Sequence, residues 1–227
     1  MIKFKKAFTM VELVMVIVVI AILAAMSIPR LKRDTRIEAI NHILMAMRYA
    51  QNTALHDDKN GGNLFAQWER SYWRFGINKC SDGGIYYYIG TDADYNGAIN
   101  NNESLVDPAN GKMTNYNSAN PCAKPSSVVG SNISPNIFLS HKYGIGSVNV
   151  VNGNNIVGGR NLFVVGFDNF GRPMDKRYIN SNTPNHAGYM TSDVNITFSF
   201  QDSSIAPFTI TIPKETGYAY LAENPKL

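Results

Sequence analysis

Residues 7–29 read AFTMVELVMVIVVIAILAAMSIP, and this stretch decides how the rest of the chain is organised. Its 23 residues carry a single charge, on Glu12. As a helix the stretch would extend about 34 Å at about 1.5 Å per residue, which matches the ~30 Å hydrocarbon core of a bilayer. The sequence therefore predicts a membrane-spanning helix, and the carboxylate near its start requires an explanation.

The residues that flank this stretch give its direction. Lys3, Lys5 and Lys6 precede the apolar run, and positive flanks stay in the cytoplasm, so the rest of the chain is expected outside it. A secretory signal peptide, cleaved near residues 24–27 (AAMS), and a plain membrane anchor are the two alternatives. Neither explains Glu12, because a carboxylate this deep costs a few kcal/mol without a partner.

Residues 7–13, AFTMVEL, resemble the prepilin signature of type IV pilin-like proteins and type II secretion pseudopilins. That signature is a small residue followed by Phe-Thr-(Leu/Met)-(Ile/Val)-Glu-Leu. The resemblance implies that a prepilin peptidase cuts between Ala7 and Phe8, and that the new amine of Phe8 is N-methylated. It also implies that Glu12 pairs with the N-terminal amine of a neighbouring subunit, which gives the charge a partner inside an apolar bundle. The residue before the cut is Ala7, where the family usually has glycine.

The pattern after the apolar run predicts that the helix continues as an amphipathic stem. Apolar residues recur at steps of three, four or seven, at Ile37, Ile40, Leu44, Met47 and Ala54. We expect this stripe to pack against the chain's own sheet. Pro29 lies where pilins commonly carry a proline, and proline permits a kink because it donates no backbone hydrogen bond. Turn residues at 57–62 end the helix.

Aromatic and β-branched runs predict that the rest of the chain is rich in strands. We expect strands at residues 67–75, 85–89, 137–140, 162–167, 194–200 and 208–212, with turns at 168–173 and 201–204. The fold class is therefore α+β: a long N-terminal helix, with a transmembrane half and an amphipathic half, packed on a C-terminal antiparallel β-sheet domain, as in the pilin fold that the signature implies. The expected organisation is a leader at 1–7, a transmembrane and filament-core helix at 8–29, a stem helix at 30–56 and a β-rich periplasmic domain at 57–227. Residues 167–173 and 210–218 also resemble the C-terminal part of H-type minor pseudopilins and fimbrial-T-type minor pilins.

A calcium-loop pattern follows the strand expected at 85–89. Residues 92–103 read DADYNGAINNNE and fit D-x-[DN]-x-[DN]-G-x₅-E at every defined position. Calcium takes about six to eight oxygen ligands, and the pattern offers them from Asp92, Asp94, Asn96, the carbonyl of Ala98, Asn100 and Glu103. Gly97 permits the sharp turn. The alternative is an Asn/Asp/Gly-rich turn that holds no ion.

Cys80 and Cys122 flank this loop. In an oxidising compartment two cysteines usually pair, so we expect a disulfide; two buried thiols are the alternative. Residues 107–136 are rich in Asn, Ser and Pro and are predicted to form a surface excursion. The disulfide and the ion would tie this excursion down.

Charge and motifs exclude other classes of protein. The formal charge of +4 falls to +1 (4 − 3) without the three lysines before the apolar run, so the basic character is poor evidence for a nucleic-acid surface. Trp68 and Trp73, with Arg70 and Arg74, could stack on single-stranded nucleic acid, but we expect them to pack within a sheet. No G-x-S-x-G, Walker, Rossmann or H-E-x-x-H pattern is present, so no enzyme is predicted.

The function that the resemblance implies is structural. The chain would be a minor pilin or pseudopilin of a type II secretion pseudopilus or type IV pilus, held in the inner membrane by a single span. Its expected partners are prepilin peptidase and other pilin subunits. The alternatives are a DNA-binding minor pilin for natural transformation, which the tail TGYAYLAENPKL disfavours because it lacks clustered Lys or Arg, and a calcium-binding surface protein with no filament role.

Overall fold

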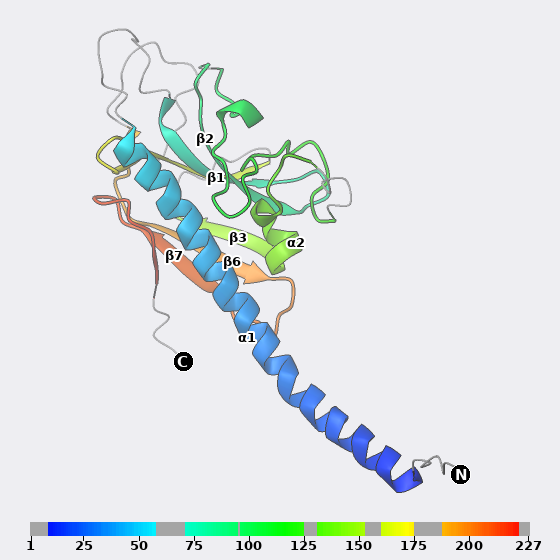
Figure 1. The fold of residues 1–227 in the computed structure, drawn as a ribbon. Helices are drawn as coiled ribbons and strands as arrows, with labels where there is room; N and C mark the ends of the chain where they lie inside the picture. Colours follow the sequence, from blue (N-terminus) through cyan, green and yellow to red (C-terminus); the bar gives the residue numbers. More distant parts are fainter. Residues whose placement is uncertain are drawn as a thin grey trace.

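A computed structural model describes residues 9–57, 71–94, 96–124, 131–152, 160–174 and 188–222, with the backbone alone for residues 27–34. One long helix, α1 (Met10–His56), organises the molecule. Its C-terminal half lies against a β-rich domain, and its N-terminal half extends away from that domain (Figure 1). At about 1.5 Å per residue the 47 residues of α1 extend about 70 Å.

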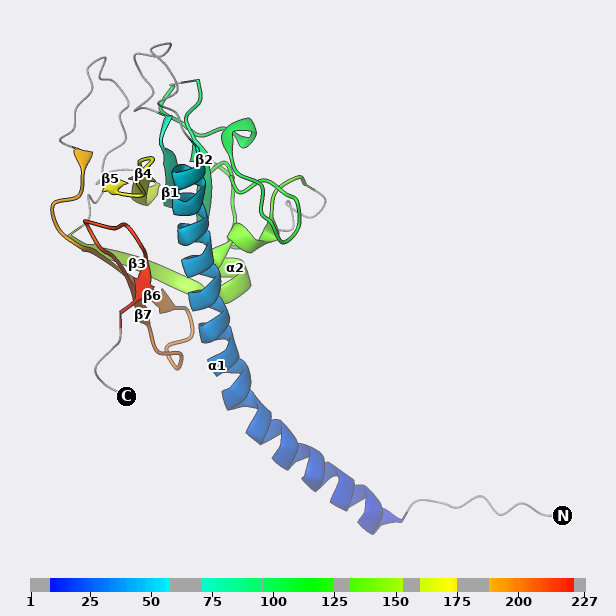
Figure 2. The same cartoon turned by 60° about the vertical axis from the view of Figure 1, so that its left-hand side comes forward.

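The axis of α1 changes direction between its two halves (Figure 2). The backbone stays helical from Met10 to His56, and Pro29 lies between the projecting and the packed parts. A proline within a helix removes one i to i−4 hydrogen bond, which permits such a bend. The bend turns the projecting half away from the domain that the other half covers.

Two antiparallel four-stranded sheets form the domain. The first has the order β2-β1-β4-β5, built from β1 (Trp73–Lys79), β2 (Ile85–Thr91), β4 (Asn161–Phe167) and β5 (Pro173–Met174). The second has the order β3-β6-β7-β8, built from β3 (Ile145–Val151), β6 (Val194–Phe200), β7 (Phe208–Ile212) and β8 (Tyr220–Leu221). Three short helical segments are η2 (Asn101–Glu103), η3 (Pro135–Ile137) and α2 (Leu139–Tyr143).

The packed half of α1 presents small and apolar side chains to this domain. Ala39, Ile43, Met47, Ala50 and Ala54 are almost completely buried. The alanines let the helix approach the sheets closely, and α1 contacts β1, β2, β4, β8 and α2. Burial of a side chain such as Ile or Met contributes about 1.5–3 kcal/mol, so this face fixes the stem to its own domain.

Polar side chains on α1 connect the stem to the C-terminal strands. The Nε of Arg36 donates a hydrogen bond to the carbonyl of Ala206 at 3.0 Å, and the Nε of Arg48 donates to the carbonyl of Ala219 at 3.0 Å. The guanidinium of Arg48 also lies 4.3 Å from the ring centre of Tyr218. The last third of the chain is thereby held against the helix that begins it.

The antiparallel α+β architecture expected from the sequence is confirmed. Strands are present at the predicted places 85–89, 162–167, 194–200 and 208–212. The strand expected at 67–75 begins only at Trp73 and continues to Lys79; residues 67–70 lie outside the described part of the chain. Strands β3, β5 and β8 were not predicted.

The strand expected at 137–140 is wrong. This segment belongs to η3 and α2. The side chain of Ser134 accepts a hydrogen bond from the N–H of Asn136, and Pro135 occupies the first helical position. Gly144, with φ of 69°, ends α2. These helix signals outweigh the apolar run between them.

Two further expectations are corrected by burial. Ile37 was assigned to the packed stripe of the stem but is 45% exposed. The segment 107–136 was predicted to be a surface excursion, yet Thr114, Cys122 and Ser134 are buried within the part of it that the structure describes. Pairing between Met113 and Ile133 joins its two ends. This segment therefore covers the core rather than leaving it.

Gln51 makes the most direct link between α1 and the loops of the domain. Its Nε2 donates to the carbonyls of Gly171 at 2.8 Å and Thr216 at 2.7 Å, and the side chain is buried. Gln51→Met keeps the volume but removes both donors, so the free energy of unfolding should fall by about 1–3 kcal/mol. Urea denaturation measures this. The exposed neighbour Asn52→Ala is the control and should stay within about 0.5 kcal/mol of the parent; equal values for both variants would contradict the role of Gln51.

Candidate functional site

The start of α1 is built by two residues of the signature. The N–H and the hydroxyl of Thr9 each donate to Oε2 of Glu12 at 2.9 Å, and the N–H of Glu12 donates to the Thr9 hydroxyl at 3.3 Å. This reciprocal arrangement is a capping box. Glu12 therefore has a partner within its own chain, which the sequence reasoning missed although Thr9-x-x-Glu12 carries the capping-box spacing.

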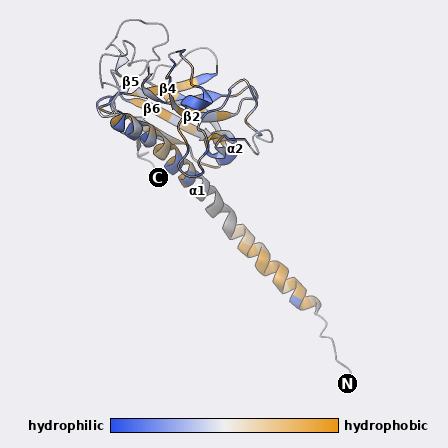
Figure 3. Cartoon of the chain, turned by 45° about the horizontal axis from the view of Figure 1, so that its top comes forward, coloured by the Kyte–Doolittle hydropathy of each residue, from blue (hydrophilic) through white to orange (hydrophobic). Residues whose placement is uncertain are grey.

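The projecting half of α1 exposes a continuous apolar surface (Figure 3). Every described side chain from Thr9 to Met26 is exposed. Thirteen of them are large and apolar, among them Val11 at 73% and Met15 at 69% exposure. Nothing in the described domain covers this surface.

No helix in the described ranges is both long and apolar enough to cross a membrane. The predicted cleavage and methylation residues Ala7 and Phe8 lie outside the described residues, as does the side chain of Pro29.

A disulfide joins Cys80 and Cys122, whose Cα atoms are 5.8 Å apart and which are separated by 42 positions in the sequence. Both cysteines are buried. Asp82 stands between them: its carboxylate accepts hydrogen bonds from the N–H groups of Gly84, Cys122 and Ala123, at 3.1, 3.1 and 2.8 Å. This disulfide connects the β1–β2 turn to the segment that follows the 92–103 loop.

The environment of Asp82 sets its protonation. Desolvation alone would raise its pKa, but the N–H donors of Cys122, Ala123 and Gly84 hold that pKa below its ordinary value. A depressed pKa stabilises the fold above the unfolded-state pKa, and this contribution is lost as the pH falls through the folded-state pKa. At neutral pH the carboxylate is charged, and it holds the backbone beside the disulfide through the N–H groups of Cys122 and Ala123.

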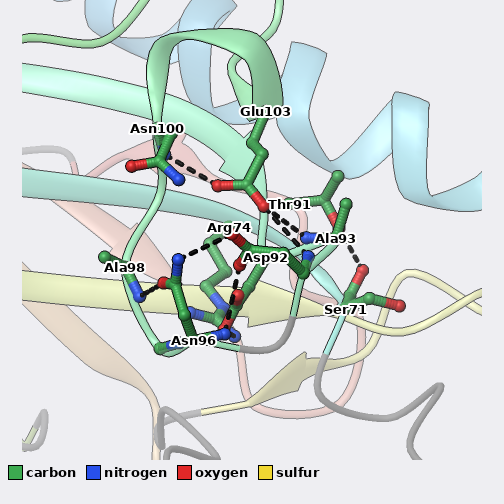
Figure 4. A network of polar contacts seen from close by, with 11 residues as sticks. Ser71, Arg74, Thr91, Asp92, Ala93, Asn96, Ala98, Asn100 and Glu103 are labelled. Carbon is green, nitrogen blue, oxygen red and sulfur yellow. Dashed lines mark hydrogen bonds and ion pairs between the residues drawn. The ribbon is translucent and has the colours of Figure 1, made fainter.

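The first half of the 92–103 loop is a chain of backbone-to-side-chain hydrogen bonds (Figure 4). The N–H of Gly97 donates to Oδ2 of Asp92 at 2.9 Å, that of Asn96 to Oδ1 of Asp94 at 3.1 Å, and that of Ala98 to Oδ1 of Asn96 at 2.8 Å. Gly97 adopts a φ of 88°, a left-handed conformation that glycine adopts without strain. The side-chain oxygens therefore turn toward the inside of the loop.

Glu103 closes the loop. Its Oε1 accepts the N–H groups of Ala93 at 2.8 Å and Asp94 at 3.1 Å, and its Oε2 accepts that of Asn100 at 2.8 Å. One carboxylate oxygen from each of Asp92, Asp94 and Glu103 lies within 4.8 Å of the others. The structure thus brings together the acidic residues that the motif selected; Tyr95, which is not among the expected ligands, lies outside the described residues.

Arg74 on β1 reaches the same place and was not expected there. Its Nη2 lies 3.3 Å from Oδ2 of Asp92, and both side chains are buried. Burial raises the pKa of Asp92, and the Arg74 charge offsets that rise in part. The stacking surface for nucleic acid, which was the less favoured interpretation, loses Arg74 to this ion pair. The indole N–H of Trp73 donates to Asp57 at 2.6 Å, and Trp68 and Arg70 lie outside the described residues.

The loop closes directly on β2 because Gly90 has no side chain. A Cβ at Gly90 would lie 2.5 Å from Cγ2 of Ile99 and 2.7 Å from the carbonyl oxygen of Glu103. The N–H of Leu105 donates to the carbonyl of Ile89 at 2.9 Å, which returns the chain to the strand. The loop therefore packs directly against the sheet.

An open cleft of about 610 Å³ lies beside this loop. Residues 98–102 form one of its walls and residues 115–118 another, and its lining is mostly asparagine and tyrosine. None of the described residues that line it carries a carboxylate, an imidazole or an amine. Its tyrosines are the only described lining residues of a type that can act as a general acid or base.

The geometry defines a class of protein: a capped N-terminal helix with an exposed apolar half, and an outer α+β domain packed on its other half. Residues 2–28 match the family model described as the prokaryotic N-terminal methylation motif. The chain therefore carries the N-terminal motif of type IV pilin-like proteins, a class that includes the pseudopilins, and the match supports the resemblance drawn from residues 7–13. The match ends before the outer domain, so it does not bear on the resemblance to the H-type group. Comparison with curated proteins and with solved structures gave no significant match.

The disulfide predicts a large loss of stability when both cysteines are replaced. Cross-linking over 42 positions restricts the unfolded chain, so Cys80→Ser with Cys122→Ser should lower the free energy of unfolding by about 2–4 kcal/mol. Denaturation of the parent in reductant is the matched control and should give the same decrease. A double variant as stable as the oxidised parent would show that the disulfide contributes nothing to the free energy of unfolding.

Proposed function

We propose that this chain is a structural subunit, a minor pilin or pseudopilin, of a type IV pilus or a type II secretion pseudopilus. The observation that carries the proposal is the uncovered apolar half of α1, with thirteen large apolar side chains between Met10 and Met26. Each contributes about 1.5–3 kcal/mol when it leaves water. A surface of this size must be covered, and helices of neighbouring subunits are the covering that the methylation motif favours.

Before assembly the same surface would lie in the inner membrane. Residues 8–29 would form the single span, with Lys3, Lys5 and Lys6 on the cytoplasmic side and the β-rich domain in the periplasm. Prepilin peptidase would remove residues 1–7 and leave Phe8 as the methylated N-terminus. On assembly, the apolar helices of neighbouring subunits would replace lipid as the cover of the exposed half of α1.

A DNA-binding role receives less support than a structural one. Four described arginines, Arg36, Arg48, Arg74 and Arg172, are bonded to carbonyls or carboxylates of their own chain. Phosphate contacts require clustered cationic side chains that are available to a ligand. These four arginines instead make contacts within the fold.

Glu12 allows a test that separates filament assembly from helix capping. A capping box accepts Gln in place of Glu, so Glu12→Gln keeps the cap at Thr9 but removes the charge that would pair with a neighbour's amine. Thr9→Ala does the reverse. We expect Glu12→Gln to reduce incorporation into sheared filaments at least about tenfold, because an apolar bundle makes an unpaired amine costly, while Thr9→Ala assembles.

Quantitative immunoblotting of the sheared and membrane fractions measures both variants in the host that makes the filament. The total amount of each variant in the cell is the control for stability. Wild-type incorporation of Glu12→Gln, combined with failure of Thr9→Ala, would mean that Glu12 only starts the helix.

A further inference from the structure

The 92–103 loop contains a buried oxygen that its own hydrogen bonds leave unused. Asp92 is completely buried, and its Oδ1 has no hydrogen-bond partner. Among the described residues, the only other buried side-chain oxygen without a hydrogen-bond partner is Oδ1 of Asn78, which belongs to a neutral amide. Burying an unpaired carboxylate oxygen costs free energy, and native structures rarely leave such a group unpaired.

Asp92 belongs to a cluster of three carboxylates that lie close enough together to bind one cation. One carboxylate oxygen from each of Asp92, Asp94 and Glu103 lies within 4.8 Å of the other two. Like charges this close repel each other unless a positive charge lies among them. Three N–H groups hold Glu103 in place and leave one of its roughly four lone-pair positions for an ion.

The charges of the side chains in the site, including Arg74, indicate which ion charge would balance them. Three carboxylates and one guanidinium give the site a formal charge of −3 + 1 = −2. The guanidinium pairs with Oδ2 of Asp92, so it does not satisfy Oδ1. A single divalent cation would neutralise the site.

We propose that residues 92–103 bind one calcium ion, which completes the coordination of Asp92 Oδ1. The ligands are side-chain oxygens of Asp92, Asp94, Asn96 and Glu103, the carbonyl of Ala98, and Asn100 directly or through water. Carbonyl and amide oxygens in a twelve-residue loop suit calcium, since magnesium demands a smaller octahedral site and retains its waters. The inference rests on the loop alone and is independent of the filament role.

The ion would lock the end of β2 to β1. Asp92 follows β2 directly, Arg74 belongs to β1, and Leu105 pairs with Ile89 after the loop. Calcium would therefore bind the folded hairpin and not the unfolded chain, and would raise the melting temperature by mass action. Loops of this kind in extracellular modules bind calcium with a Kd on the order of 0.1–1 mM, which sets the concentration range of the test.

The test is thermal unfolding of the full-length chain in detergent micelles, first stripped with a chelator and then titrated with calcium. About 10 mM calcium should raise Tm by a few to about 10 °C, and equimolar magnesium by less than half as much. Asp94→Ala should melt close to the parent in chelator, because Asp94 is exposed, and should lose most of the calcium shift. Asp92→Asn also breaks the Arg74 pair, so Asp94→Ala is the decisive variant.

Glu215→Gln is the matched control, because it removes a carboxylate that is 80% exposed and lies outside the loop. It should keep the full calcium shift. A parent Tm that calcium leaves unchanged, or an equal shift in the parent and in Asp94→Ala, overturns the proposal. A magnesium shift as large as the calcium shift would also overturn the assignment to calcium.

Discussion

The whole molecule depends on one helix, α1, whose apolar side chains are buried along only half of its length. From Ala39 to Ala54 the buried face of α1 packs on the domain that follows it in sequence. From Met10 to Met26 the helix has no such cover. The hydrophobic effect acts equally on both halves, so the outer domain fixes the stem and leaves the other half to be covered from outside the chain.

The outer domain shows how a segment with little apolar content is kept in place. Residues 92–136 contribute few large apolar side chains to the core, and they are held instead by specific links. The Cys80–Cys122 disulfide fixes one side, hydrogen bonds from the loop to Glu103 fix another, and Asp107 accepts from Ser134 and Asn136 at 2.6 and 2.8 Å. Such links replace the missing apolar burial, and the disulfide does so by restricting the unfolded chain.

The parts of this structure that sequence predicts are those set by local pattern. Alternating apolar residues identified β6 and β7, and the spacing of Asp92 to Glu103 identified the residues that the loop brings together. The expectations that failed had overlooked either a local helix signal or a tertiary contact. The apolar run at 137–140 reads as a strand, but the Ser134 cap and Gly144 make it helical. The burial of Arg74 against Asp92 was not predicted, because no local pattern around residue 74 indicates a contact with a loop 18 residues later.

The proposed role of the apolar half of α1 is that of a processed filament core. Mass spectrometry of the N-terminal peptide of the chain, isolated from membranes of its own host, tests it most directly. We expect a peptide that begins at Phe8 with an N-methylated amine. A chain that begins at Met1, or one cut after residues 24–27 as a secretory signal would be, would contradict it, since the first keeps the leader and the second removes the surface that assembly needs.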